Sequence, residues 1–239
     1  MTGKELRHRL IGLSWLPSHG RDLLLRAWDS YSQSEFAQLY RTVRPYTMCG
    51  DARLRGLYRA IRHVVAHDVP GDIVECGAAR GGSAALMGLA LKAAGSGRPL
   101  WVLDTFEGMP PPTSDDPDWK IASLYTGKVR GDLREVQALF QRLGIADRCK
   151  LVKGLFAETL SKCDAESIAV LHLDCDWYES VKVCIDHLYD RVSRGGIIQI
   201  DDYGHWQGAR KAVDEFLRRR SINVGLQRLD YTGRQLIKP

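Results

Sequence analysis

Two mostly aliphatic runs, each followed by acidic residues, constrain this chain more than any other feature of its sequence. The pattern predicts a buried strand at 168–173, a helix at 179–189, a turn at 195–196 and a second buried strand at 197–200. Apolar strands joined by a crossover helix belong to a parallel sheet, whose strands all end at one edge. We therefore expect Asp174, Asp201 and Asp202 to meet at that edge.

Three carboxylates at neighbouring strand ends would lie close together, because adjacent strands are only about 4.8 Å apart. Their negative charges would repel each other and raise the pKa of each group unless a cation lay between them. An all-oxygen ligand set without cysteine or histidine ligands favours Mg²⁺, Mn²⁺ or Ca²⁺ over zinc. The simpler alternative is that these acids are solvated turn residues, but their place at two strand ends favours a metal site.

A strand, a glycine-rich turn and a helix form a second feature, at residues 72–94. The strand 72–76 leads into the turn GAARGGS and then into a helix at 84–94, which brings backbone N–H groups close to a bound ligand. The glycines differ from the dinucleotide pattern G-x-G-x-x-G, and a purely structural turn is the alternative. The next strand, 100–103, ends in Asp104, which is placed to accept hydrogen bonds from a ribose. Together these features indicate a cofactor that contains adenosine.

Composition limits the classes of partner. Apolar residues make up 44% of the 239 residues, which is enough for the core of one domain, and the net charge of +5 is mild. The run Arg218–Arg220 suits the end of a helix better than a nucleic-acid surface, so we expect no nucleic-acid partner. No apolar run approaches a membrane span, and six cysteines without C-x-x-C spacing favour a reduced, cytoplasmic location.

Residues 1–70 have a helical pattern, and we interpret them as a cap of the same domain and a contact in a homo-oligomer, a dimer or tetramer. Leucines at 6, 10, 13, 23 and 24, together with Trp28, are expected to pack on a neighbouring element. Within the domain at 71–239, residues 105–131 contain three successive prolines and no periodicity, which is typical of a lid. Its acids Asp115, Asp116 and Asp118 are interpreted as solvated.

The remaining pattern predicts a helix at 133–143, a strand at 149–152, a short helix near Glu158, a helix at 209–220, and a hairpin of strands 224–229 and 235–237. Alternating strands and helices of this kind predict an α/β fold with a doubly wound, mostly parallel sheet and a C-terminal antiparallel hairpin.

At this point the sequence resembles the macrocin O-methyltransferase (TylF-type) family, which uses S-adenosylmethionine to methylate sugar hydroxyls. The blocks that carry the resemblance, between residues 45 and 220, are Tyr46-Thr47-Met48, GDIVECGAARGGS (71–83), LDTFEGMP (103–110), LHLDCDWYES (171–180) and GGIIQIDDYG (195–204). The resemblance implies a Rossmann-like class I methyltransferase fold, with S-adenosyl-L-methionine as cosubstrate, Mg²⁺ as the metal and a sugar or glycoside as acceptor.

The resemblance also implies roles for individual residues. Those expected around the cofactor are Glu75, Gly77 and Gly81 at its methionine part, Asp104 at the ribose, Thr47 and Met48 at the carboxylate, and also Ala78, Arg80, Ser83, Thr105 and Phe106. Asp174, Asp201 and Asp202 would hold Mg²⁺, and Asp174 would also be the general base, with His205 as second choice. Departures from the family pattern are Ala78-Ala79 in the glycine turn and His172 in place of a frequent arginine.

Several alternatives remain open at this level. His205 and Trp206 either face the acceptor or are ordinary loop residues. His172 is more typical of a core histidine. Asp176 could support the metal ligands by a hydrogen bond from outside the ligand set. A catechol-like diol is an alternative acceptor. A nicotinamide-dependent oxidoreductase and a non-catalytic adenosyl-binding protein are further alternatives, because a fold does not fix a function.

Overall fold

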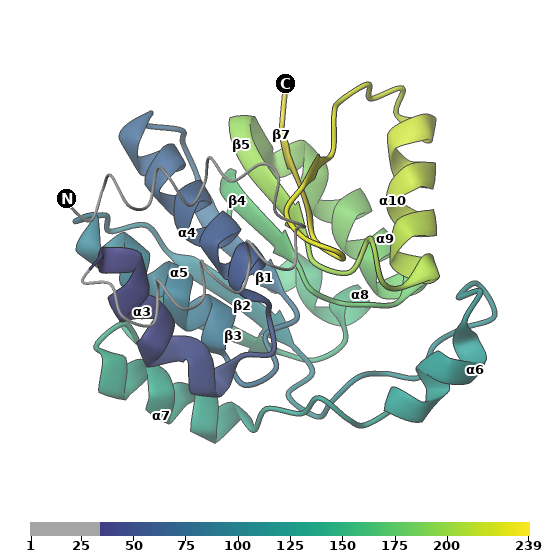
Figure 1. Cartoon of the computed structure of the whole chain (residues 1–239), viewed down its shortest axis with the longest axis horizontal. Helices are drawn as coiled ribbons and strands as arrows, with labels where there is room; N and C mark the ends of the chain where they lie inside the picture. The colour runs from purple at the N-terminus through teal and green to yellow at the C-terminus, as the bar shows by residue number, and fades with distance from the viewer. Residues whose placement is uncertain (1–33) are drawn as a thin grey trace, which may run out of the picture.

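A computed structural model describes residues 34–239, and its centre is a seven-stranded sheet in the order β3-β2-β1-β4-β5-β7-β6 (Figure 1). The strands are β1 (Asp72–Cys76), β2 (Leu100–Asp104), β3 (Cys149–Lys153), β4 (Ile168–Leu173), β5 (Val192–Ile200), β6 (Gln227–Arg228) and β7 (Arg234–Ile237). Strands β1 to β5 pair in parallel, whereas β7 runs antiparallel to both β5 and β6. The predicted doubly wound sheet and its C-terminal hairpin are therefore confirmed.

Helices cover both faces of the sheet (Figure 1). The first hydrophobic core contains side chains of α3 (Glu35–Val43), α4 (Asp51–Ala66), α5 (Gly82–Ala93) and α7 (Leu133–Leu143). The second contains side chains of α9 (Tyr178–Leu188) and α10 (Gln207–Arg219), together with the last residue of the short helix α6 (Trp119–Ala122) and the residue after the short helix α8 (Phe156–Thr159). Strand β4 is buried on both faces because it lies between these two layers.

The strand order reverses between β1 and β4, which lie side by side although β2 and β3 separate them in sequence. Ligands of such sheets bind in the crevice beyond the carboxyl ends of the strands at this reversal. The pairing of β4 with β5 brings Leu173 opposite Ile200, so the acids that follow both strands begin at the same level. This register is the physical basis of the predicted acidic edge.

Gly195 and Gly196 do not form the predicted turn but lie inside β5. Gly195 has a φ of +78°, and the pairing of β4 with β5 is irregular between Ile168 and Val170. The Gly195 N–H donates to the carbonyl of Lys238 at 2.8 Å, so the glycines make a bulge that remains hydrogen-bonded. The chain instead enters β5 from the short 3₁₀ helix Tyr189–Arg191.

Before α4, residues 47–50 form a loop that leads into the helix. The expected packing of the leucines at 6 to 24 and of Trp28 lies outside the described residues. Within residues 34–239, no helix combines the length and the apolar character that crossing a membrane requires.

Candidate active site

The glycine-rich turn lies between β1 and α5, and its shape depends on its glycines and on Asp104. Gly77 has a φ of +91°, and a Cβ there would lie 1.7 Å from the carbonyl oxygen of Asp174, so only glycine fits. Asp104 accepts hydrogen bonds from the N–H groups of Ala78 at 2.7 Å, Ala79 at 2.9 Å and Phe106 at 2.6 Å. Asp104 therefore fastens the turn to the end of β2, in addition to facing the cavity described next.

A cavity of about 560 Å³ opens at the carboxyl ends of the parallel strands. The residues predicted to bind cofactor, metal or acceptor that line it are Thr47, Met48, Gly77, Ala78, Ser83, Asp104, Thr105, Asp174, Asp202 and His205. The fold thus brings the glycine turn, the loop before α4 and two of the strand-end acids to one space.

Other predicted residues lie outside the cavity wall. Phe106 is 2% exposed and packs in the first hydrophobic core, and Gly81 precedes α5 with a φ of +79°. The guanidinium of Arg80 lies over the ring of Tyr46 at 5.9 Å. Glu75 is fully buried and pairs with His172, so any contact of these four residues with a cofactor stays a prediction.

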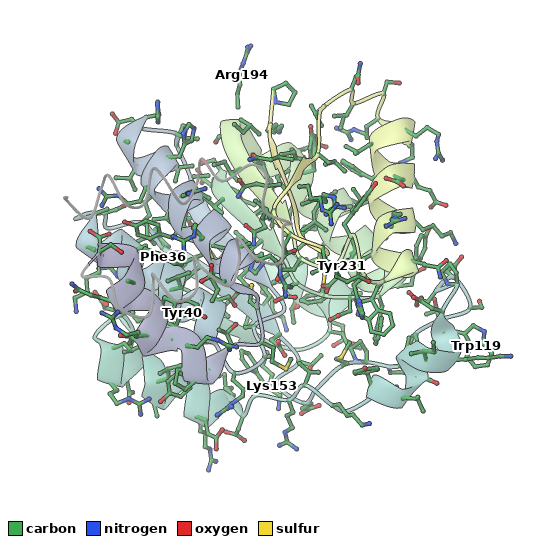
Figure 2. All side chains as sticks on the ribbon, in the orientation of Figure 1. Phe36, Tyr40, Trp119, Lys153, Arg194 and Tyr231 are labelled. Atoms are coloured by element: carbon green, nitrogen blue, oxygen red, sulfur yellow. The ribbon has the colours of Figure 1, made fainter. Side chains whose placement is uncertain are left out.

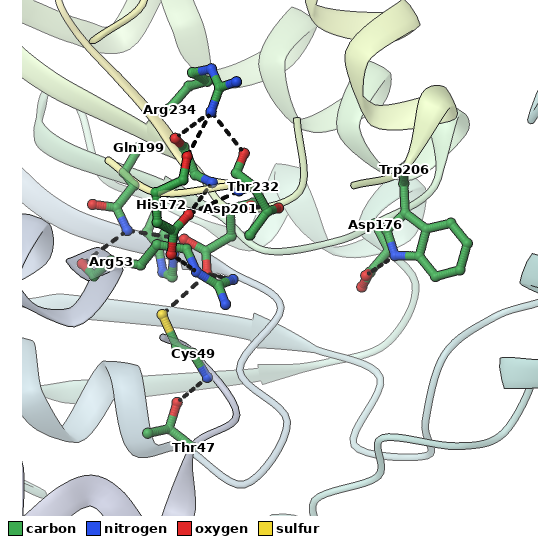
Figure 3. Close-up of polar contacts among 12 residues, drawn as sticks. Thr47, Cys49, Arg53, His172, Asp176, Gln199, Asp201, Trp206, Thr232 and Arg234 are labelled. Carbon is green, nitrogen blue, oxygen red and sulfur yellow. Dashed lines mark hydrogen bonds and ion pairs between the residues drawn. The ribbon is translucent and has the colours of Figure 1, made fainter. Parts of the chain in front are cut away.

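Asp201 is the most heavily hydrogen-bonded of the three acids (Figure 3). Its carboxylate accepts from Arg53 Nη1 at 2.7 Å, Cys49 Sγ at 3.1 Å, His172 Nε2 at 3.0 Å and Gln199 Nε2 at 2.9 Å. Burial alone would raise its pKa, but the charges of His172 and Arg53 hold it well below the usual range. Two donors on each oxygen leave Asp201 little capacity to bind an ion unless one donor moves.

His172 is the core histidine that the sequence favours, and it joins Asp201 to Glu75. Its Nδ1 lies 2.9 Å from Glu75 Oε1 and its Nε2 lies 3.0 Å from Asp201 Oδ1. Because carboxylates only accept, both nitrogens donate and the ring carries a positive charge. Burial opposes this charge, but the two acids outweigh burial and raise the pKa of His172.

Asp174 and Asp202, unlike Asp201, have raised pKa values. Burial, with the nearby charges of Asp201 and Asp202, raises the pKa of Asp174, and burial with the charges of Asp176 and Asp201 raises that of Asp202. The Oδ2 atom of Asp202 is buried without a hydrogen-bond partner. Asp176 also has a raised pKa, of about 7, from burial and from Asp174, although Trp206 Nε1 donates to it at 2.8 Å (Figure 3).

These acids fit the chemistry of a divalent cation, although not as three equal ligands. One ligand atom from each of His172, Asp174 and Asp201 lies within 4.8 Å of the others. The nitrogens of His172 are already occupied by carboxylates, so the oxygens of Asp174 and Asp202 are the ones available from the cavity. A buried oxygen without a partner beside crowded carboxylates is a place where a cation would offset negative charge.

The cavity wall beyond the acids is aromatic. The rings of Trp177 and Trp206 meet edge to face at 4.9 Å, and Tyr125 of the lid meets Trp206 in the same manner at 5.5 Å. His205 is exposed beside Trp206, with its Nδ1 3.4 Å from the hydroxyl of Tyr231. His205 and Trp206 therefore line the cavity, and a contact with the acceptor stays a prediction.

The prediction that all three lid acids are solvated is wrong for Asp116, and Asp118 is half-buried. The side chain of Asp116 is 1% exposed and accepts the N–H of Tyr178 at 2.7 Å. Sequence reasoning also missed Cys49, Arg53 and Gln199, which hold Asp201. No spacing in the sequence signals Cys49 and Arg53, which lie about 150 residues away from Asp201 in the chain, whereas Gln199 is two residues from it.

Comparison with known proteins agrees with this geometry. Residues 35–237 match the family described as Macrocin-O-methyltransferase (TylF). The chain is 37% identical, over 79% of its length and 74% of the relative's, to the 8-demethyl-8-(2,3-dimethoxy-α-L-rhamnosyl)-tetracenomycin-C 4'-O-methyltransferase of Streptomyces olivaceus. It is 33% identical to the mycinamicin III 3''-O-methyltransferase of Micromonospora griseorubida, over 90% of this chain and 87% of that one.

A solved structure is similar over most of the chain. The O-methyltransferase NovP superposes with a TM-score of 0.76 at 32% identity, over 81% of this chain and 82% of that one. The fold is that of class I methyltransferases. The chain therefore belongs to the macrocin O-methyltransferase (TylF) family of O-methyltransferases.

Proposed function

We infer that this protein transfers the methyl group of S-adenosylmethionine to a hydroxyl group of a glycosylated natural product, with Mg²⁺ as the metal. The observation that carries the proposal is the convergence of Asp174 and Asp202, which has a buried oxygen without a partner, on the cavity that the glycine turn also lines. The relatives named for methylation of a rhamnosyl-tetracenomycin and of mycinamicin III support the same class of acceptor.

The cofactor would occupy the part of the cavity between the glycine turn and the end of β2. Gly77 and Ala78 present backbone there, and Ser83 lies in the first turn of α5, where helix N–H groups favour a carboxylate. Thr47 and Met48 also line the cavity. S-Adenosylmethionine supplies a methyl group that its positive sulfonium activates for displacement.

For the metal, Asp174 and Asp202 are the proposed direct ligands. Bound Mg²⁺ lowers the pKa of a hydroxyl that it ligates. Asp201 would join them if a donor such as Arg53 gave up its contact, and Arg53 has a second acid partner, Asp230, at 3.2 Å. Arg53 thus supplies the positive charge that balances Asp201, and the carboxylate of Asp201 already accepts four hydrogen bonds.

Asp174 is the proposed general base. Its carboxylate is partly exposed in the cavity and its raised pKa reflects a strong tendency to take up a proton. It would accept the proton of the acceptor hydroxyl while the hydroxyl oxygen forms its bond to the methyl carbon and the carbon–sulfur bond breaks. The aromatic wall of Trp177, Trp206 and Tyr125 would orient the sugar, so most of the acceleration would come from positioning. His205 remains the second candidate for the base.

The charges of the cavity favour an uncharged glycoside over a nucleoside diphosphate sugar. Among the described residues that line it, Arg53 is the one arginine or lysine, and it is paired with Asp201 and Asp230. Acids on the acceptor side, Asp176 and Glu179, would repel a diphosphate. A completed glycoside brings no such charge.

The test compares four acceptors with the purified protein and S-adenosylmethionine: the rhamnosylated tetracenomycin of the Streptomyces olivaceus relative, mycinamicin III, TDP-rhamnose and catechol. We expect methylation of at least one glycoside, loss of activity with a chelator, and recovery with added Mg²⁺. Preferential methylation of catechol would replace the proposed acceptor class, and full activity in a metal-free buffer would contradict the metal.

A further inference from the structure

The lid, residues 105–131, is held to the body of the protein by a buried carboxylate. Asp116 lies among exposed loop residues, yet its side chain is 1% exposed. Its Oδ1 accepts the N–H of Tyr178 at 2.7 Å and its Oδ2 accepts the N–H of Thr113 at 3.0 Å. Tyr178 is the first residue of α9, where an N–H lacks a partner within the helix and a negative charge is favoured.

The first turn of α10 is shaped to receive the same carboxylate. A Cβ on Gly208 would lie 2.0 Å from Asp116 Oδ1 and 3.0 Å from the backbone nitrogen of Tyr178, so the contact requires glycine at this position. One residue earlier, the N–H of Gln207 donates to Asp118 Oδ2 at 3.2 Å. The lid is thus attached to the starts of two helices by backbone groups that no helix bond uses.

The attached segment builds part of the cavity wall. Met109 and Lys128 close the base of the lid through a hydrogen bond of 3.0 Å, and Asp116 lies in the segment between them. That segment supplies Tyr125, which packs on Trp206, and the carbonyl of Pro110, which accepts from Trp177 Nε1 at 2.7 Å. Figure 1 shows the lid helix α6 reaching out beyond the sheet below α10, and in Figure 2 the labelled Trp119 points away from the body.

We propose that Asp116, received by Gly208, is a positioning residue that latches the lid against α9 and α10 and so holds the lid's part of the acceptor wall in place. The kinetic consequence rests on the proposed function, because it concerns the acceptor. The latch touches neither the glycine turn nor the acids Asp174 and Asp202. Its loss should therefore affect the acceptor and leave the affinity for adenosylhomocysteine intact.

The two sides of the latch can be broken separately. Asp116→Ala removes the carboxylate, and Gly208→Ala leaves it in place but fills the space that it needs. Asp116→Asn keeps one accepting oxygen and should give an intermediate phenotype. The matched control is Asp115→Asn: among the described residues its half-exposed side chain pairs with Lys211 of α10 at 2.9 Å, a surface pair that contributes little to stability, and the amide keeps one accepting oxygen.

Limited trypsin digestion reports on the latch without any acceptor, since Lys120 and Lys128 lie in the lid. We expect both alanine variants to be cut in the lid about tenfold faster than the wild type and the control, because a released loop opens more often. The double variant Asp116→Ala/Gly208→Ala should be cut no faster than either single variant, since both act on one contact. Equal cutting of the wild type and both single variants would overturn the proposal.

Kinetics with the rhamnosylated tetracenomycin supply the second readout. We expect kcat/KM for this acceptor to fall about 100-fold in Asp116→Ala and Gly208→Ala, as misplacement of a binding wall by about 1 Å can cause. Adenosylhomocysteine affinity measured by calorimetry should stay within about twofold. An equal loss of that affinity would show a general structural defect and overturn the positioning role. A wild type that fails to methylate this probe would count against the proposed acceptor class alone, and trypsin would still decide the latch.

Discussion

The two sides of the acidic strand edge differ in how the protein treats buried negative charge. On one side, Arg53 and His172 neutralise Asp201 and Glu75 through contacts of 2.7 to 3.0 Å, although the Oε2 atom of Glu75 has no hydrogen-bond partner. On the other side, Asp174 and Asp202 face the cavity with raised pKa values, and one oxygen of Asp202 has no partner. The difference teaches that a fold can balance some buried carboxylates with its own cations and still leave neighbouring carboxylates whose charge a bound ion would balance.

The largest effect is expected on the open side, which consists of the cavity-lining acids Asp174 and Asp202. Asp174→Asn keeps the shape of the side chain but removes the base and a proposed metal ligand, so methyl transfer should fall about 10³-fold. Its thermal stability without metal should not fall, because repulsion with Asp201 and Asp202 is relieved. Activity measured by mass spectrometry, together with a melting curve, tests both. A variant that keeps wild-type activity would remove Asp174 from the mechanism.

The complementary change removes the positive charge of His172 from between Asp201 and Glu75, the neutralised side. His172→Leu leaves Asp201 and Glu75 without the cation between them, and loss of one partner from a buried ion pair costs about 3–5 kcal/mol. Urea denaturation should show this loss in the free energy of unfolding. A change below about 1 kcal/mol would mean that His172 does not neutralise these acids.

A smaller effect is expected where the two sides meet. Arg53→Met removes the cation that competes for Asp201, so Mg²⁺ should raise the melting temperature of this variant more than it raises that of the wild type. Without metal the variant should melt below the wild type, because Asp201 then loses a partner. The measurement is a melting curve in chelator and in a series of Mg²⁺ concentrations. Identical Mg²⁺ responses would show that Arg53 and the ion do not compete.

The smallest effect is expected at Asp202. Asp202→Asn removes a crowded charge from the open side, so the unfolding free energy in chelator should stay equal or rise, by about 1 kcal/mol at most. Asp201→Asn, measured beside it, should be clearly destabilising because four donors contact that carboxylate. Equal losses in the two variants would erase the distinction between the two sides.

The sequence alone was enough to predict the order of elements, the parallel sheet and the meeting of Asp174 with Asp201 and Asp202. These features follow from local hydrophobic patterns and from the rule that parallel strands end at one edge. The glycine bulge in β5 was predicted as a turn, because a glycine pair permits both conformations and only pairing with β4 and the chain end selects one.

What the tertiary structure alone decided is the state of each acid. Asp201 is neutralised because α4 brings Arg53 to it, beside Cys49 of the preceding loop, and Asp116 is buried because α9 and α10 begin beside it with a glycine at 208. Both outcomes depend on contacts between segments 62 to 152 residues apart. Local sequence patterns report which residues are acidic and where strands end, but the charge and solvent around a carboxylate depend on packing across the whole chain.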